Sequence, residues 1–228
     1  MSREPGLAGP LKVLQVHARY RTRGGEDTTV DNERRLLEEA GHRVELFEAK
    51  NPDRPLESAL ALARSPWNRR AARELAGKID SFEPDIVHVH NTWFSLSPAI
   101  LSRARRGGCA VVMTLQNYRL VCVSSNLFRD GHHCEDCVGH GPWRGVAHRC
   151  YRDSGVLSGV LAGHLQLHRA LGTWRREVDV YIAVSTFGVA RHRAGGVPAE
   201  RIVVKDNFAP DPGPRAAGPA WWRGSDRC

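Results

Sequence analysis

The sequence has no long hydrophobic run. None of its 228 residues belongs to a stretch that approaches the roughly 20 apolar residues of a membrane-spanning helix. Residues 1–10 include Arg3 and Glu4 and lack the apolar core of a secretory signal peptide. We therefore expect a cytoplasmic protein. Gly155 to Gly163 is apolar but short, so we expect a packed helix there and keep peripheral contact with the inner face of the membrane as an alternative.

Positive charge is in excess but is nowhere concentrated. The chain has 33 Lys and Arg against 25 Asp and Glu, a formal net charge of +8. A polyanionic partner would suit this charge. The arginines are scattered, however, and do not form the basic stripe with interleaved aromatics that is typical of nucleic-acid binding. An Arg-rich solvated surface is the favoured interpretation, and a zinc-dependent nucleic-acid-binding protein is kept only as a remote alternative.

Cysteine is scarce as well. There are six cysteines, and Cys122, Cys134, Cys137 and Cys150 fall in one short stretch. In a cytoplasmic protein such clustering predicts a metal site before a disulfide. One Cys-x-x-Cys pair with two flanking cysteines can close a tetrahedral site, so we expect structural zinc, with free thiols as the competing interpretation. Four histidines could replace one cysteine ligand and rank behind it: His132, His133, His140 and His148.

Short apolar runs alternate with helical patterns along most of the chain. This rhythm predicts an α/β fold with a doubly wound, mostly parallel Rossmann-like sheet. We expect helices near 26–40, 56–80, 98–106, 154–177 and 186–194, the first ending at Gly41. The predicted strands are 11–17, 43–48, 85–90, 110–115, 179–184 and 201–205.

The same pass along the chain sets the expected domain boundaries. Residues 1–10 are predicted to be a flexible N-terminus and 11–209 a single Rossmann-like domain. Residues 117–151 are rich in Cys, His, Gly and Asp and lack apolar periodicity, so we interpret them as an insertion in that domain. Residues 210–228 are mostly Pro, Gly, Ala and Arg, and we expect a linker or disordered tail.

A glycine pair precedes the first predicted helix. Gly24, Gly25 and Glu26 lie at its start, where the absence of Cβ atoms and the free backbone N–H groups could admit a phosphate. The chain has no G-x-G-x-x-G motif, and a Gly pair before a helix is as often simple turn chemistry.

Polar residues follow three of the predicted strands. In the run DIVHVHNT, His88 and His90 share one face, and His90 and Asn91 lie at the carboxyl end, where α/β sheets bind ligands. We expect a satisfied core position for His88, whereas His90 could equally contact a ligand or support a loop. Gln116, Asn117 and Tyr118 leave the fourth strand and could bind sugar hydroxyls, or cap the loop. Ser185 ends the fifth strand, and helix capping is favoured over substrate contact there.

These segments form an ordered series that resembles the N-terminal, acceptor-side domain of family 4 glycosyltransferases, which have the two-domain GT-B architecture. The resemblance covers about residues 11–210. It implies a retaining transfer of a sugar from a nucleotide-sugar donor to a carbohydrate or lipid-linked acceptor, with no metal required for catalysis. Gly24 and Gly25 match the loop beside the donor phosphates, and His90, Asn91 and Ser185 match positions at the cleft edge. The series is KVLQVH, RTRGGED, DIVHVHNT, TLQNYRLVC, LFRDGHHCEDC, HRCYR, IAVSTF and RIVVKDNF.

Two departures from the family pattern limit what the resemblance implies. The chain has Gln116 where this subgroup usually has histidine, and glutamine cannot usefully accept a proton at neutral pH. The family's second domain, with its E-x7-E element, has no counterpart after Asn207, so we assign no catalytic residue. We expect a truncated or frameshifted gene whose product is inactive alone. The alternatives are a split enzyme with a separate donor-domain subunit and a non-catalytic carbohydrate-binding remnant.

Overall fold

The computed structural model describes residues 9–19, 22–52 and 54–209. The predictions of a flexible start and of a linker or disordered tail fall mainly on residues 1–8 and 210–228, outside the described residues.

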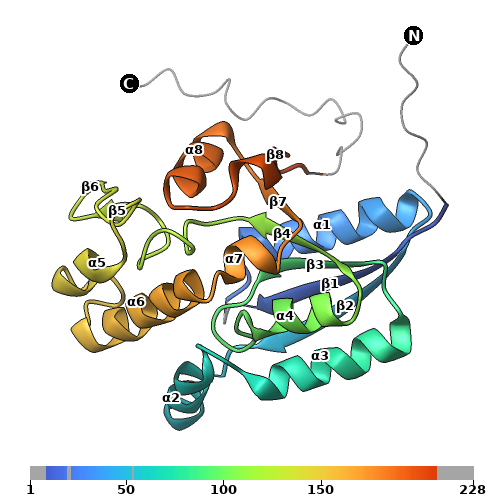
Figure 1. The fold of residues 1–228 in the computed structure, drawn as a ribbon, viewed down its shortest axis with the longest axis horizontal. Helices are drawn as coiled ribbons and strands as arrows, with labels where there is room; N and C mark the ends of the chain where they lie inside the picture. Colours follow the sequence, from blue (N-terminus) through green and yellow to red (C-terminus); the bar gives the residue numbers. More distant parts are fainter. Residues whose placement is uncertain (1–8, 20–21, 53, 210–228) are drawn as a thin grey trace, which may run out of the picture.

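A single six-stranded parallel sheet forms the centre of the molecule (Figure 1). Its strand order is β2-β1-β3-β4-β7-β8, so the chain winds outward from β1 in both directions. All five neighbouring pairs are parallel, which confirms the doubly wound Rossmann-like fold predicted from the alternating pattern. The strands are β1 (Lys12–Arg19), β2 (Arg43–Lys50), β3 (Ile86–Asn91), β4 (Ala110–Leu115), β7 (Val180–Ala183) and β8 (Ile202–Val204).

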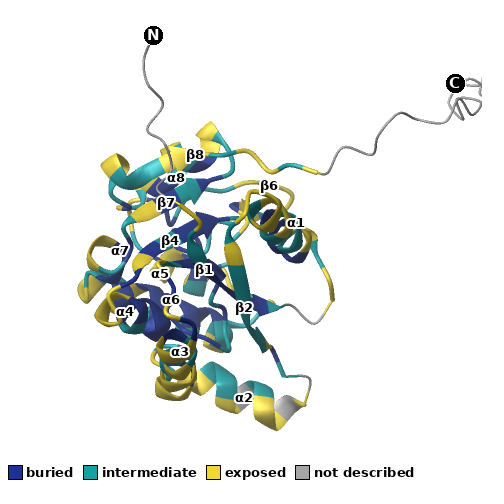
Figure 2. Cartoon of the chain, turned by 90° about the vertical axis from the view of Figure 1, so that its right-hand side faces the viewer, coloured by how far each residue is buried: buried dark blue, intermediate teal, exposed yellow. Residues whose placement is uncertain are grey.

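Helices cover both faces of the sheet. In Figures 1 and 2, α1 lies on one face, and α3 and α4 lie on the other. This division follows from strand alternation, because successive side chains of a strand point to opposite faces. The helices are α1 (Gly25–Glu39), α2 (Pro55–Arg64), α3 (Arg69–Phe82), α4 (Ala99–Arg106), α5 (Trp143–Ala147), α6 (Gly155–Ala170), α7 (Thr173–Arg176) and α8 (Thr186–Ala194).

The apolar core lies between the sheet and α3 and α4. Leu14, Val16, Val87, Val89 and Val111 are fully buried there, at alternating positions of three strands. Figure 2 shows this interior as continuous buried ribbon. Each such side chain contributes about 1.5–3 kcal/mol of transfer free energy. This face therefore holds the sheet together.

The opposite face, under α1, is polar instead. Gln15 and His17 of β1 and His88 and His90 of β3 occupy the intervening positions, and all four are buried. Buried polar groups of this kind require partners. The sheet thus has one apolar face and one face with buried polar side chains.

Two of the predicted helices are interrupted. The region 56–80 forms α2 and α3, separated at Trp67 and Asn68, and the Asn68 side chain accepts hydrogen bonds from two N–H groups that open α3. The region 154–177 breaks after α6 at Gly172, which has φ +66°. Gly41 follows α1 with φ +86°, as expected of a C′ glycine.

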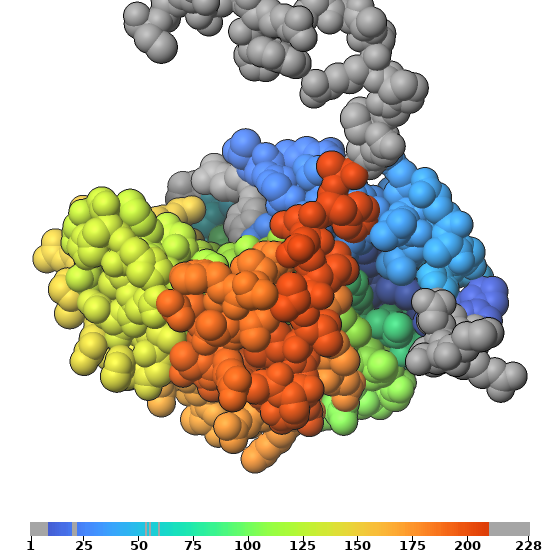
Figure 3. All heavy atoms as spheres, turned by 90° about the horizontal axis from the view of Figure 1, so that it is seen from above, coloured from blue at the N-terminus to red at the C-terminus, as the bar shows by residue number. Residues whose placement is uncertain are grey.

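Residues 117–151, which we interpreted as an insertion, contain a short hairpin and a short helix, and several of their apolar side chains belong to the main core. Strands β5 (Phe128–Arg129) and β6 (His132–His133) form an antiparallel hairpin. Asp130 and Gly131 join them with φ of 51° and 81°, the positive values that a type I′ turn requires. In Figure 3 the insertion lies beside the surface of α6 to α8.

Helix α6 is a packed helix, as predicted for Gly155 to Gly163. Leu161 and Ala162 are fully buried in a cluster with Val123 of the insertion. Within the described part of the chain, no helix is both long enough and apolar enough to cross a membrane.

Candidate substrate site

The glycine loop is fixed by a buried carboxylate, Asp27, that connects it to β1. The carboxylate of Asp27 accepts a hydrogen bond from the Gly24 backbone N–H at 2.8 Å and another from Nε2 of His17 at 2.9 Å. Both side chains are almost completely buried. Burial alone would raise the pKa of Asp27, but the hydrogen bonds from Gly24 and His17, with the charge of Arg19, hold this pKa below its usual value.

Our sequence analysis missed this pair. Asp27 occupies the third position of α1, where an acidic side chain closes a capping box with the N-cap residue. That spacing could have revealed the role of Asp27. The partner His17, in a strand with several apolar residues, had no such signal.

The glycines face open space. A Cβ atom built on Gly24 or Gly25 would meet no heavy atom within 4 Å. Gly24 has φ −126°, which any residue adopts. Neither the backbone conformation nor close packing therefore explains why residue 24 is a glycine. The space beside the first N–H groups of α1 is the place predicted for a phosphate.

The loop after β4 reaches the start of α1. Asn117 donates a hydrogen bond from Nδ2 to Oε1 of Glu26 at 2.7 Å. Gln116 and Asn207 face each other with both amide contacts at 3.4 Å. The structure thus brings Glu26, Asn117 and Gln116 to one edge of the sheet, together with the chain that follows β8.

His88 is a satisfied core residue, as predicted. Its Nε2 is hydrogen-bonded to Oγ1 of Thr114 at 2.7 Å. Burial, with the nearby charge of Lys205, lowers the pKa of His88 to about 4. The ring is therefore neutral at physiological pH.

His90 is buried and has unused polar atoms. Neither ring nitrogen has a hydrogen-bond partner among the described residues, although Nε2 lies 3.4 Å from Oε2 of Glu33. Burial, reinforced by the charges of His88, His17 and Lys205, holds the pKa of His90 well below its ordinary value. A neutral imidazole at the strand end can donate one hydrogen bond and accept one from a ligand.

Glu33 and Lys205 form an ion pair that the sequence did not reveal. The Lys205 Nζ lies 2.6 Å from Oε1 of the buried Glu33. Within the described residues, the ligand atoms of Glu33, His88 and His90 lie within 4.8 Å of one another, a spacing that could hold a metal ion. Because the Lys205 ammonium already neutralises this carboxylate, we interpret the cluster as an ion pair.

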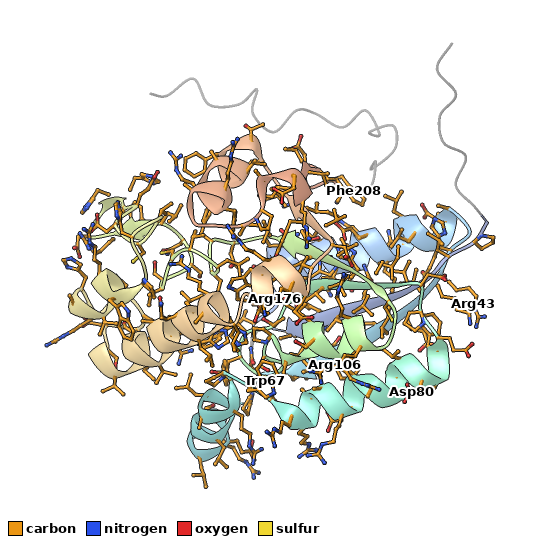
Figure 4. All side chains as sticks on the ribbon, viewed as in Figure 1. Arg43, Trp67, Asp80, Arg106, Arg176 and Phe208 are labelled. Carbon is orange, nitrogen blue, oxygen red and sulfur yellow. The ribbon has the colours of Figure 1, made fainter. Side chains whose placement is uncertain are left out.

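That ion pair holds the last described segment against α1. Asn32 of α1 donates a hydrogen bond to the Phe208 carbonyl at 3.3 Å, and the Lys205 ammonium lies over the Phe208 ring. Figure 4 labels Phe208 at this end of the molecule.

Three predicted site residues have structural partners. Asn91 donates to the Ala18 carbonyl and accepts from the Trp93 N–H, so its amide supports the loop. Ser185 caps α8 by accepting from the Gly188 N–H at 3.1 Å, as our sequence analysis favoured. Tyr118 stacks on His192 of α8, with centroids 5.6 Å apart.

A small cavity of about 30 Å³ opens at the carboxyl ends of β3 and β4. Four predicted residues line it, namely His90, Asn91, Gln116 and Asn117. The sequence analysis missed several others that also line it, including Trp93, Arg119 and His164.

Arg119 has unused donors at this cavity. Its Nε and Nη1 atoms have no hydrogen-bond partner among the described residues, while Nη2 donates to Ser125 at 3.1 Å. The guanidinium lies 5.2 Å from the centroid of the Trp93 ring and 5.9 Å from that of Tyr151. A planar guanidinium held in this way can bind an anionic group bidentately.

His164 completes the far wall of the cavity. Burial, followed by the charges of His168 and Arg119, lowers the pKa of His164 to about 3. Arg119 therefore supplies positive charge to the cavity, whereas His90 and His164 stay neutral near pH 7.

The chain belongs to Glycosyltransferase Family 4, whose sequence pattern it matches over residues 23–209. The matched range contains every predicted site residue and the whole insertion. No curated protein sequence matches the chain.

Solved structures with similar folds include a UDP-GlcNAc 2-epimerase from Neisseria meningitidis bound to UDP-GlcNAc, at 15% identity and TM-score 0.43, covering 86% of this chain and 46% of that one. The lipopolysaccharide outer core galactosyltransferase WaaB has 13% identity and TM-score 0.45, with coverages of 85% and 45%. Anabaena Alr3699/HepE in complex with UDP has 14% identity and TM-score 0.41, with coverages of 86% and 44%. This chain therefore spans less than half the length of these proteins.

Proposed function

We propose that the chain supplies the acceptor-side domain of a retaining glycosyltransferase with GT-B architecture. The reaction moves a sugar from a nucleotide-sugar donor to a carbohydrate or lipid-linked acceptor. Membership of Glycosyltransferase Family 4 supports the reaction class. No residue is assigned as a catalytic acid or base.

One observation links this proposal to particular residues. The glycine loop, the strand end at His90 and the loop at Asn117 meet at one edge of the sheet, joined by the Asn117–Glu26 hydrogen bond. In open α/β sheets this carboxyl edge is where ligands bind. Gly24 and Gly25 would face the donor phosphates, and the residues around the small cavity beside His90 would contact the acceptor.

The acceptor cavity favours an anionic acceptor. Arg119 is its cationic side chain with unused donors, and its position is fixed by stacking against Trp93 and Tyr151. A diphosphate-linked lipid sugar or an acidic saccharide presents the oxygen atoms that a guanidinium binds. Binding at such a site positions the acceptor hydroxyl without requiring a metal.

Transfer would also require a second, donor-binding domain. The described residues form one Rossmann-like sheet with its helices, whereas a GT-B enzyme closes two such domains around the donor. We propose that this chain alone turns over little or no substrate, because the groups that stabilise the leaving diphosphate lie on the other domain. That domain would lie on the same gene or on a separate subunit.

The first experiment measures ligand binding to this chain by isotope-edited NMR. A short-chain prenyl diphosphate sugar should shift the resonances of Asn117 and Arg119, and a UDP-sugar should shift the amides of Gly24 and Gly25 more weakly. Arg70→Met, on the exposed surface of α3, is the matched control for Arg119→Met. Unchanged resonances around the cavity with every acceptor would contradict the proposal.

A second experiment tests transfer. The chain is assayed with labelled nucleotide sugars, alone and together with a donor domain co-expressed from the downstream DNA. Product is expected only in the combined reaction. Acceptor binding without turnover in that reaction would favour a non-catalytic carbohydrate-binding protein, a candidate supported by Gln116 because an amide is not a proton acceptor.

A further inference from the structure

Four cysteines from separate parts of the insertion line one small cavity. Cys122 follows the β4 loop, Cys134 and Cys137 follow β6, and Cys150 follows α5. Their separation in sequence means that the fold, and not chain proximity alone, brings them together. None of the four is in a disulfide.

The size of this cavity limits what it can hold. Its volume is about 10 Å³, whereas a single water molecule needs roughly 10–15 Å³ by the same measure. A single metal ion is the group that such a small space suits best. Four soft sulfur ligands favour zinc, which is bound tetrahedrally in closed structural sites.

We propose that Cys122, Cys134, Cys137 and Cys150 bind one structural zinc ion. A tetrahedron with Zn–S bonds of about 2.3 Å has edges of roughly 3.8 Å. The four cysteines are not among the described groups whose ligand atoms lie within 4.8 Å of one another. Metal binding would therefore draw their side chains together.

A metal ion would stabilise the insertion, because this segment contains little regular secondary structure. Its hairpin has two residues per strand and α5 has five residues. A two-stranded hairpin alone is marginally stable in water. Leu120, Val121 and Leu127 pack into the main core, but Cys134 and Cys150 are only partly buried, so a metal ion would hold the outer part of the segment.

Arg129 would offset part of the charge of the metal site. Four thiolates and one zinc ion carry a net charge of −2, by four negative charges against two positive. Arg129 lines the same cavity, and its Nη1 donates to Asp136 at 3.1 Å. A guanidinium at this position can also donate to a zinc-bound thiolate, and such outer contacts tune metal affinity.

The zinc site would affect the substrate cavity by fixing the position of the segment that lines it. Cys122 lies three residues after Arg119, and the intervening Leu120 lines the substrate cavity. On the other side of the insertion, Glu135 accepts from Arg191 of α8. A zinc ion would hold the whole segment between the cavity and α8. It would not touch the substrate, because four protein ligands leave no open coordination position.

The test measures metal in the full chain, purified without chelators. We expect about one zinc ion per chain, and none retained in Cys137→Ser. The matched control is Cys109→Ser, which removes a buried thiol that lies outside the cavity and should leave the zinc content unchanged. Arg129→Gln should keep the zinc but release it to a chelator at roughly 10–100-fold lower chelator concentration.

A measurement on the unmodified chain covers the case in which a cysteine variant fails to fold. Chelation should release one zinc ion and make four additional thiols reactive, while the far-ultraviolet circular dichroism of the sheet and helices persists. Adding zinc alone should reverse the change. Folded protein without zinc, a mass two hydrogens lower per cysteine pair, or bound iron with sulfide would each overturn the proposal.

Discussion

The Nε2 atom of His17 lies 2.9 Å from Oδ1 of Asp27, and both side chains are buried between β1 and α1. The same carboxylate accepts from the Gly24 backbone N–H. One buried side chain thus fixes both the start of α1 and the glycine loop to the carboxyl-terminal part of β1. The loop is preorganised, so a ligand that binds its N–H groups does not have to order it first.

Replacing Asp27 should therefore destabilise the fold and loosen the loop together. Asp27→Ala leaves His17 and the Gly24 N–H without their acceptor, and we expect a loss of about 1–3 kcal/mol in the free energy of unfolding. Asp80→Ala is the control, since Asp80 is exposed on α3 (Figure 4) and should change stability by less than ~0.5 kcal/mol. Urea unfolding measures both. Equal stability of the two variants would contradict the role of Asp27.

The buried histidines predict loss of stability in acid. Burial lowers the pKa of His88 to about 4 and that of His164 to about 3. The unfolded chain therefore binds more protons between these values and the ordinary histidine pKa of about 6.5. Stability should rise with pH across that window, by up to ~1.4 kcal/mol per pH unit for each histidine, and level off above it.

His164→Gln isolates one of these contributions. Below about pH 6.5, the unfolding free energy of the variant should rise less steeply with pH than that of the unmodified chain. The slopes should differ by up to ~1.4 kcal/mol per pH unit, the effect of one proton, and should be equal above that pH. The comparison at higher pH is the internal control, because His164 is neutral in both states there. Parallel curves throughout would show that the pKa of His164 is the same in the folded and unfolded chain.

The Glu33–Lys205 pair makes a prediction of opposite sign. Burial raises the pKa of Glu33, and the hydrogen bond and charge of Lys205 offset part of that rise. Lys205→Met should cost about 1–3 kcal/mol by leaving the carboxylate unpaired. A raised carboxyl pKa gives stability that is present at low pH and is lost as pH rises through the folded value, so the loss should be larger near pH 8 than near pH 5.

A double-mutant cycle checks the Lys205 prediction. Glu33→Gln combined with Lys205→Met removes the charge together with its partner, and should recover much of the stability that Lys205→Met loses. Thermal or urea unfolding at the two pH values gives the stability of the unmodified chain, the two single variants and the double variant. Additive losses in the double variant would mean that the two side chains do not stabilise each other.

The sequence predicted the six strands of the large sheet because most are short apolar runs and residues 43–48 alternate as a strand does. Periodicity does not show the breaks at Asn68 and Gly172, since helical spacing continues across them. The hairpin at Asp130 and Gly131 has the Asp-Gly signature of a type I′ turn, but its flanking strands are too short to alternate visibly.

The site was predicted less completely, because several of its residues come from distant parts of the sequence. Residues that follow a strand could be placed at its carboxyl edge, so His90 and Asn117 were found. Lys205 meets Glu33 across 172 residues, and Arg119 acquires its place from Trp93 and Tyr151. No local pattern marks such pairs.

Arg119 gives the prediction that bears most directly on the acceptor. Arg119→Lys keeps the charge but loses the planar fork and the stacking on Trp93, so it should weaken binding of a prenyl diphosphate sugar. Arg119→Met should weaken it by at least about 10-fold, because hydrogen bonds to charged groups contribute roughly 1.5–3 kcal/mol. Binding of the matching sugar without its diphosphate should change far less. If both ligands lost affinity equally, Arg119 would be acting through the packing of the cavity wall, and the proposed preference for an anionic acceptor would be wrong.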